Sequence, residues 1–273
     1  MSIAEALARA RALGLDRLDA QLLLSRVLQQ PRPWLIAHAE RALTPPQQQA
    51  FERACRRRAD DEPLAYLLGE REFHGLMLQV APAVLVPRVD TETLVDWALE
   101  LLAAMCAPQV ADLGTGSGAI ALALKHRTPA ASVCAVELSA AALEVARANA
   151  ARLGLDLELL QGDWWQPLQG RRFDLVVSNP PYIDGDDPHL AALRHEPVLA
   201  LTPGADGMTA LSAIVRDAPA HLREGGWLLL EHGHQQAEAA CGLLRAAGFS
   251  DIATRADLAG RPRCSGGRWP TRG

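Results

Sequence analysis

Four consecutive residues have the types and the order to hold a planar NH2 group: Asn179, Pro180, Pro181 and Tyr182. They follow residues 173–177, a valine-rich run typical of a buried strand, so Asn179 is expected where that strand ends. The prolines restrict the backbone and supply no N–H, which leaves their carbonyls free as acceptors. The Asn179 oxygen and the Pro180 carbonyl can each accept one N–H, with Tyr182 on the flat face. Considered alone, the motif is also compatible with a tight turn walled by a tyrosine, although less so.

A glycine-rich stretch joins a short predicted strand to a predicted helix and consists of Asp112, Leu113, Gly114, Thr115, Gly116, Ser117 and Gly118. Glycines at this place allow a tight turn and a close approach of the backbone to a ligand at a helix N-terminus. With Ala119 the run also satisfies the loosened dinucleotide fingerprint, so the glycines alone do not identify the ligand. The Asp112 carboxylate disfavours a pyrophosphate and favours a cationic group, such as the ammonium of a methionine moiety.

Two further strand ends carry acidic residues. Glu137 lies about 20 residues past Gly118, the distance at which an acidic side chain binds a ribose diol; the alternative is a charge at a helix start. Asp163 can accept from an adenine amino group while Trp164 covers the ring, and a core tryptophan beside a turn is the alternative. Together these residues describe S-adenosylmethionine better than NAD.

Composition narrows the class of protein. The chain has 273 residues, 49% hydrophobic content and a formal charge of −5, without a block of like charge long enough for a nucleic-acid tail. Five scattered cysteines without a C-x-x-C pair indicate reduced thiols in a cytoplasmic protein and argue against a zinc site. His232 and His234 are interpreted as structural or surface histidines, because no third metal ligand has a suitable spacing. No signal peptide or membrane span is expected.

Hydrophobic periodicity divides the chain into three parts. Residues 1–69 predict a bundle of short helices, with Asp16 and Thr44 as helix caps. Residues 70–90 mix β-formers with Gly and Pro and predict a hairpin linker. From residue 91 to 273 a helix capped by Asp90 precedes alternating strands and helices. This order predicts an α/β fold, a doubly wound and mostly parallel sheet with ligands at the carboxyl ends of its strands.

With these motifs the chain resembles the release factor glutamine methyltransferases, bacterial enzymes of the class I methyltransferase fold. The most specific matches are residues 71–73, 87–88 with 90–92, 112–118, 179–184 and 231–233, and the resemblance covers nearly the whole chain. Val89 stands where the family usually has Pro, and Glu137 where Asp is commoner. The segment 261–273 fits only loosely and is expected to fray after Trp269.

The resemblance implies a seven-stranded sheet and methyl transfer from S-adenosylmethionine to the Gln amide of the Gly-Gly-Gln motif in peptide chain release factors. It implies cofactor contacts from Asp112, Gly114, Thr115, Gly116, Ser117, Gly118, Glu137, Asp163, Trp164 and Asn179. Substrate contacts are expected from Phe73, Arg88, Asn179, Pro180, Pro181 and Tyr182. Asn179 and Pro180 are the expected catalytic pair, and the helical bundle is expected to dock the substrate. We expect a monomer that binds no nucleic acid.

An amide nitrogen is a poor nucleophile, so catalysis is expected to depend on placement of the NH2 group by Asn179 and Pro180. The motif holds no His or carboxylate placed as a base, and water is the expected proton acceptor. Three other functions use similar residues: an adenine amino-methyltransferase acting on DNA, a glutamine methyltransferase of a ribosomal protein, and a non-catalytic nucleotide- or partner-binding module. The acidic chain argues against DNA, and Asp112 argues against a dehydrogenase.

Overall fold

The computed structural model describes residues 1–204 and 206–271. Its internal contacts divide the chain into two compact units, Met1–Glu70 and Arg71–Gly273. The boundary between the units lies between Glu70 and Arg71, at the start of the segment predicted as a hairpin linker.

The first unit is helical, as its sequence pattern predicts. Its helices are Ile3–Ala12 (α1), Arg17–Leu28 (α2), Arg32–Ala37 (α3), Pro45–Ala59 (α4) and Leu64–Leu68 (α5). Asp16 caps α2 by accepting from Leu18 N, and Thr44 forms a reciprocal capping box with Gln47 at the start of α4. The apolar faces meet in a core that includes Ile3, Leu24 and Phe51. Both predicted caps are therefore confirmed.

The second unit begins with a two-stranded sheet and continues as a seven-stranded one. The strands of the small sheet are Glu70–Phe73 (β1) and Leu76–Gln79 (β2). The large sheet has the order β5-β4-β3-β6-β7-β9-β8. Its strands are Gln109–Leu113 (β3), Ser132–Glu137 (β4), Glu158–Gln161 (β5), Phe173–Ser178 (β6), Leu222–Glu231 (β7), Ser250–Ala256 (β8) and Pro262–Arg268 (β9). The first five pair in parallel, and β9 is antiparallel to both β7 and β8. The predicted hairpin and the mostly parallel sheet are confirmed.

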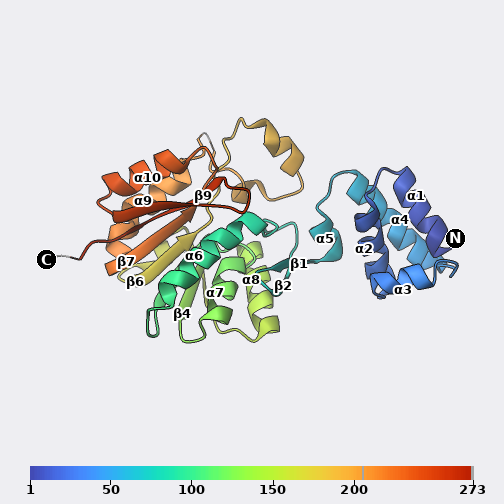
Figure 1. Cartoon of the computed structure of the whole chain (residues 1–273), viewed down its shortest axis with the longest axis horizontal. Helices are drawn as coiled ribbons and strands as arrows, with labels where there is room; N and C mark the ends of the chain where they lie inside the picture. The colour runs from blue at the N-terminus through green and yellow to red at the C-terminus, as the bar shows by residue number, and fades with distance from the viewer. Residues whose placement is uncertain (205, 272–273) are drawn as a thin grey trace. The chain divides into compact units, whose positions relative to one another are not determined.

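Helices cover both faces of the large sheet (Figure 1). They are Glu92–Leu102 (α6), Ala119–Arg127 (α7), Ala140–Leu153 (α8), Thr209–His221 (α9) and Ala237–Ala246 (α10), with short 3-10 turns at Val89–Thr91 (η1), Gln166–Leu168 (η2), Pro188–Leu193 (η3) and Val198–Ala200 (η4). Alternate strand residues face opposite sides: Val177 packs in the cluster that contains α6 and α7, and Val176 packs in the cluster that contains α9 and α10. The valine-rich strands are thus buried on both faces, as expected of a doubly wound fold.

Two expectations from the sequence pattern need correction. Asp90 does not cap α6; it lies inside η1 and pairs instead with Arg263 at 3.1 Å. The strands β8 and β9 were not recognised, because Pro262–Arg268 carries Gly and Ser where a strand pattern would show apolar residues. Close packing explains the glycines: a Cβ on Gly266 would lie 2.4 Å from Leu229 Cδ2. The predicted fraying after Trp269 concerns residues that lie partly outside the described ones.

The fully buried Asn149 of α8 joins three segments of the second unit. Its side chain accepts from Gln79 N at 2.6 Å and donates to Gln79 O at 3.0 Å and Ser117 O at 2.9 Å. Replacing it with Leu leaves these backbone groups without partners, so we expect Asn149→Leu to lower the free energy of unfolding by ~2–4 kcal/mol. Urea unfolding measures this change. Glu144→Ala, on the exposed side of the same helix, serves as the control and should cost at most ~0.5 kcal/mol; equal losses in the two variants would contradict the assigned role of Asn149.

Candidate active site

The register of the parallel strands brings the predicted site residues to one level at the carboxyl edge of the sheet. Leu113 is in register with Val136 on one side and with Ser178 on the other, and Ser178 is in register with Leu230. The residues that come next on these four strands are Gly114, Glu137, Asn179 and Glu231. Motifs that are far apart in the sequence therefore share one edge.

Asp112 lies beneath the glycine-rich loop and is fully buried. Its Oδ2 accepts from Thr115 Oγ1 at 2.6 Å and from Ala121 N at 3.2 Å, whereas its Oδ1 has no partner. Burial is the main reason that the pKa of Asp112 is raised to about 7, and these two hydrogen bonds oppose the rise. A cation bound near this carboxylate would compensate the cost of its burial.

The wall beside the loop is formed by Glu137 and Trp164. Glu137 accepts from Gly116 N at 2.8 Å and from Ser139 N at 2.9 Å, so it ties the loop to the start of α8. Gly114 has φ +72°, and a Cβ there would lie 3.1 Å from the Trp164 ring, which explains why glycine is needed. Trp164 itself has φ +40°, an uncommon conformation for a bulky residue, and it faces the loop.

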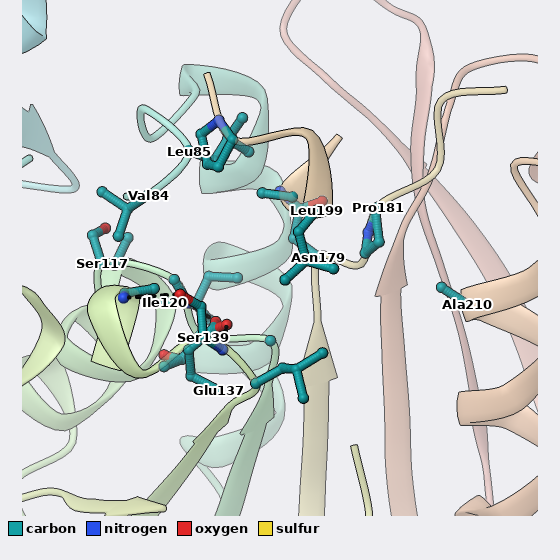
Figure 2. Close-up of a pocket in the computed structure, with 18 of the residues that line it drawn as sticks. Val84, Leu85, Ser117, Ile120, Glu137, Ser139, Asn179, Pro181, Leu199 and Ala210 are labelled. Atoms are coloured by element: carbon teal, nitrogen blue, oxygen red, sulfur yellow. Dashed lines mark hydrogen bonds between the residues drawn. The ribbon is translucent and has the colours of Figure 1, made fainter. Parts of the chain in front are cut away.

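A cavity of about 350 Å³, called here the first cavity, connects the loop with the proline corner. Figure 2 shows Ser117 and Glu137 on one side of it and Asn179 and Leu199 on the other. Sequence-predicted residues in its lining are Phe73, Arg88, Gly114, Thr115, Gly116, Ser117, Glu137, Asp163, Trp164, Asn179 and Pro181. Asp112 lies below this lining, and Gly118 caps the N-terminus of α7.

A second cavity, of about 460 Å³, is lined by Asn179, Pro180 and Tyr182. Asn179 and Arg88 belong to both cavities. The Asn179 amide donates its Nδ2 to Thr91 Oγ1 at 3.2 Å, an orientation that leaves Oδ1 available as an acceptor. The two cavities thus meet at the residue predicted to orient an NH2 group.

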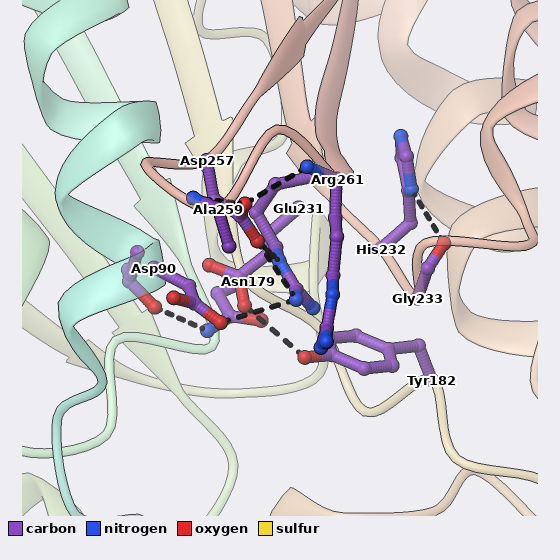
Figure 3. A network of polar contacts seen from close by, with 11 residues as sticks. Asp90, Asn179, Tyr182, Glu231, His232, Gly233, Asp257, Ala259 and Arg261 are labelled. Atoms are coloured by element: carbon purple, nitrogen blue, oxygen red, sulfur yellow. Dashed lines mark hydrogen bonds and ion pairs between the residues drawn. The ribbon is translucent and has the colours of Figure 1, made fainter.

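Three residues in the lining of the second cavity, Asp90, Tyr182 and Glu231, belong to a polar network (Figure 3). Tyr182 Oη donates to Glu231 Oε1 at 3.2 Å, and Arg263 pairs with Asp90 at 3.1 Å and with Asp257 at 3.2 Å. Glu231 was noticed in the sequence only as part of a matching motif, without a role. The structure places it against Tyr182, within the lining of the second cavity.

Glu196 is a site residue that the sequence analysis missed. Its buried carboxylate accepts from Val86 N at 3.1 Å and is paired with Arg88. This contact holds the loop after the proline corner, which includes η3 and η4, against the segment before η1. Leu199 and Ala200 of that loop line the first cavity. No local signal could identify Glu196, because its partners lie more than a hundred residues away in the sequence.

Within residues 1–204 and 206–271 no group of three or more His, Cys, Asp and Glu side chains is arranged to hold a metal ion. His232 is buried and bonds to Ser265 Oγ at 2.8 Å and to Gly233 O at 2.9 Å. In the same described part of the chain, no helix has both the length and the apolar character that a membrane crossing needs.

Comparison with known proteins gives the family. A methyltransferase small domain matches residues 87–196, and a PrmC N-terminal domain matches residues 2–69. A relative from Bordetella pertussis named release factor glutamine methyltransferase is 50% identical over 257 residues, which is 93% of this chain and 95% of the relative. One of the same name from Burkholderia pseudomallei is 49% identical and covers 95% of this chain and 94% of its own. The chain belongs to the release factor glutamine methyltransferase family.

Solved structures agree at the level of the fold. A methyltransferase from Pyrococcus furiosus superposes with a TM-score of 0.54 at 18% identity, over 72% of this chain and 90% of that one. Membership of the family confirms the expected enzyme class, an S-adenosylmethionine-dependent methyltransferase, and the seven-stranded fold that the resemblance implied.

The first cavity fits this cofactor on the structure's own evidence. Gly114 leaves open a space beside Trp164 that any side chain would fill, and two residues before it the buried Asp112 has one carboxylate oxygen without a partner. Glu137 and Asp163 add carboxylates to the same lining, for hydroxyl and amino groups.

The raised pKa of Asp112 predicts a pH-dependent stability. Between about pH 4 and about pH 7 the folded protein binds a proton here that the unfolded chain releases, so stability from this group falls as pH rises. Asp112→Asn retains an oxygen for Thr115 and Ala121 but cannot ionise. We expect the free energy of unfolding of the variant to increase relative to that of the wild type by ~1 kcal/mol per pH unit across this window. Urea unfolding at pH 5, 6 and 7 measures the difference. A difference that stays constant with pH would show that Asp112 does not titrate in this range.

Proposed function

We propose that this chain methylates the side-chain amide of the Gln in the Gly-Gly-Gln motif of peptide chain release factors. The name of the relatives supports the substrate, since they are release factor glutamine methyltransferases over nearly their whole length. The observation that carries the proposal is the position of Asn179, which lines both the first cavity, with the glycine loop, and the second, with Pro180 and Tyr182.

In this proposal the first cavity holds S-adenosylmethionine, which when bound supplies an electrophilic methyl group. Asp112 faces the cationic methionine end through the glycine loop, and the backbone from Gly114 to Gly118 approaches the ligand closely because it lacks Cβ atoms at three positions. Glu137 accepts from hydroxyl groups of the ribose, and Asp163 and Trp164 bind the adenine.

The proline corner orients the substrate amide. Asn179 Oδ1 and the Pro180 carbonyl accept the two N–H groups, because the Asn179 Nδ2 is already committed to Thr91. Tyr182, Phe73 and Arg88 bound the substrate. Both acceptors also stabilise the positive charge that develops on nitrogen, and placement of this kind can lower the activation barrier by ~7–11 kcal/mol in favourable cases.

We further infer that three segments of the chain have different roles. Residues 1–69 dock the release factor, residues 70–90 form the linker, and residues 91–273 carry out the transfer. With release factors as substrates the enzyme works in the cytoplasm, and we expect a monomer without nucleic-acid contacts. No described feature favours the DNA or the ribosomal-protein alternative.

Replacing the orienting amide tests the proposal. We expect Asn179→Ala to lower the rate of methylation at least a hundredfold while changing the affinity for S-adenosylmethionine less than tenfold, since the lost acceptor acts on the substrate amide. Mass spectrometry of the Gly-Gly-Gln peptide after incubation with a release factor measures methylation, and titration calorimetry measures affinity. His189→Ala is a matched control: its side chain is 85% exposed and lines neither cavity. An unmodified peptide with wild-type enzyme and cofactor would refute the proposed function.

A further inference from the structure

Glu231, the last residue of β7, has no role in the mechanism above. It is 1% exposed, and its Oε2 lacks any hydrogen-bond partner. Among the described residues, only Ser25 Oγ and Asp112 Oδ1 are also buried side-chain polar atoms without a partner. An unpaired buried carboxylate oxygen is costly, and Glu231 lines the same cavity as Asn179 and Pro180. A role of Glu231 in the reaction would explain why this cost is tolerated.

Tyr182 connects this carboxylate to the cavity. Its hydroxyl donates to Glu231 Oε1 at 3.2 Å, and its ring lines the second cavity (Figure 3). Burial first, and then the charge of Glu231, raise the pKa of Tyr182. The phenol therefore stays protonated near neutral pH, and it can pass a proton on only while it accepts another.

The charged and titratable groups around Glu231 come from every neighbouring element. They are Asp90 of η1, Tyr182 after β6, Arg263 and Cys264 of β9, Asp257 after β8, and the Arg88–Glu196 pair in or beside the cavity wall. Burial is the largest influence and raises the pKa of Glu231 to about 7, with Asp90 acting in the same direction. Hydrogen bonds from Thr91 and Tyr182 and the charge of Arg263 oppose the rise.

We propose that Tyr182 and Glu231 form the path by which the proton leaves the methylated amide, with the Tyr182 hydroxyl as relay and the Glu231 carboxylate as acceptor. This inference rests on the proposed function. It replaces the expectation that water takes the proton, because the acceptor lies outside the proline motif in which a base was sought.

The transfer balances in atoms and charge. The amide nitrogen forms its new bond to the methyl carbon, and the electron pair of the broken carbon–sulfur bond stays on sulfur. The nitrogen then releases one proton to the Tyr182 oxygen and recovers its lone pair. Tyr182 at the same time gives its own proton to Glu231, which becomes a neutral carboxylic acid and later loses the proton to solvent.

The oxygens at the proline corner do not serve as well for this step. Asn179 Oδ1 and the Pro180 carbonyl are neutral amide oxygens and hold a proton far more weakly than a carboxylate whose pKa is about 7. A nearby negative charge also favours the cationic nitrogen that precedes proton loss. Asp90 is a poorer candidate, because it is half exposed and paired with Arg263.

The first test is the pH dependence of methylation by Glu231→Gln. Glutamine retains an oxygen that can accept from Tyr182, so the substitution preserves any purely structural role of residue 231. In the wild type the single-turnover rate should rise with pH through about 7, as Glu231 ionises. The variant should lose this rise, and above about pH 7 its rate should be at least tenfold lower than that of the wild type. Its KM for the release factor and its affinity for S-adenosylmethionine should stay within threefold of the wild-type values. A variant that retains the wild-type pH profile overturns the proposal.

Two further variants test the relay and the acceptor separately. Tyr182→Phe keeps the ring but removes the relay between the amide nitrogen and Glu231, so the rate should fall and the rise with pH should be lost, as in Glu231→Gln. Asp90→Asn removes a negative neighbour, so the rise moves to lower pH. A rise with pH that persists in Tyr182→Phe, or one that moves to higher pH in Asp90→Asn, would contradict the assignment of the titrating group to Glu231.

A second measurement needs neither cofactor nor release factor. Infrared difference spectra of wild type against Glu231→Gln should show a protonated carboxyl band below about pH 7 that disappears as the pH rises. A Glu231 that is already ionised at pH 5.5 overturns the proposal. Because this experiment involves no methylation, its failure is distinguishable from failure of the proposed function, which the release factor peptide tests alone.

Discussion

The parallel register of four adjacent strands is the constraint on which the site depends. Because Leu113, Val136, Ser178 and Leu230 are linked through neighbouring pairs, the residue after each of them lies at the same edge of the sheet. A slip of one residue in any of these pairs would turn a buried valine or leucine toward the wrong layer and would displace a functional residue by more than 3 Å. The packing of both helical layers therefore fixes the chemistry, although none of the packed residues takes part in it.

Burial of charge is the second feature that the site uses. Asp112, near the end of β3, and Glu231, the last residue of β7, are buried, and each has one oxygen without a hydrogen-bond partner. Both pKa values are raised to about 7 by burial. The two carboxylates differ in their surroundings: Asp112 lies under a loop suited to a cationic ligand, and Glu231 lies behind a phenol. A carboxylate shielded from water therefore occurs in both parts of the site, near the cavity assigned to the cofactor and in the cavity assigned to the substrate.

The sequence predicted most of the α/β core because its signals are local. The alternation of strands and helices after residue 91 was predicted, and the proline corner follows a strand whose valine-rich run is easily recognised. The failures involve contacts between distant segments. Pro262–Arg268 lacks a strand pattern because Gly266 must pass close to Leu229, and Asp90 was predicted as a cap because its partner Arg263 cannot be inferred from neighbouring residues. Glu196 has no local signal at all.

The position of β9 has a consequence for biosynthesis. This strand is the last of the sheet in chain order, yet it lies between β7 and β8, and its Arg263 joins Asp90 to Asp257 below the proline corner. A nascent chain that has left the ribosome as far as β7 can already pair β3 with β6 and form the glycine loop. It cannot yet form the ion pairs of Arg263 with Asp90 and Asp257, because Arg263 belongs to β9. The half of the site that we assign to the cofactor can therefore assemble during translation, whereas the half assigned to the substrate must wait for the final strand to insert.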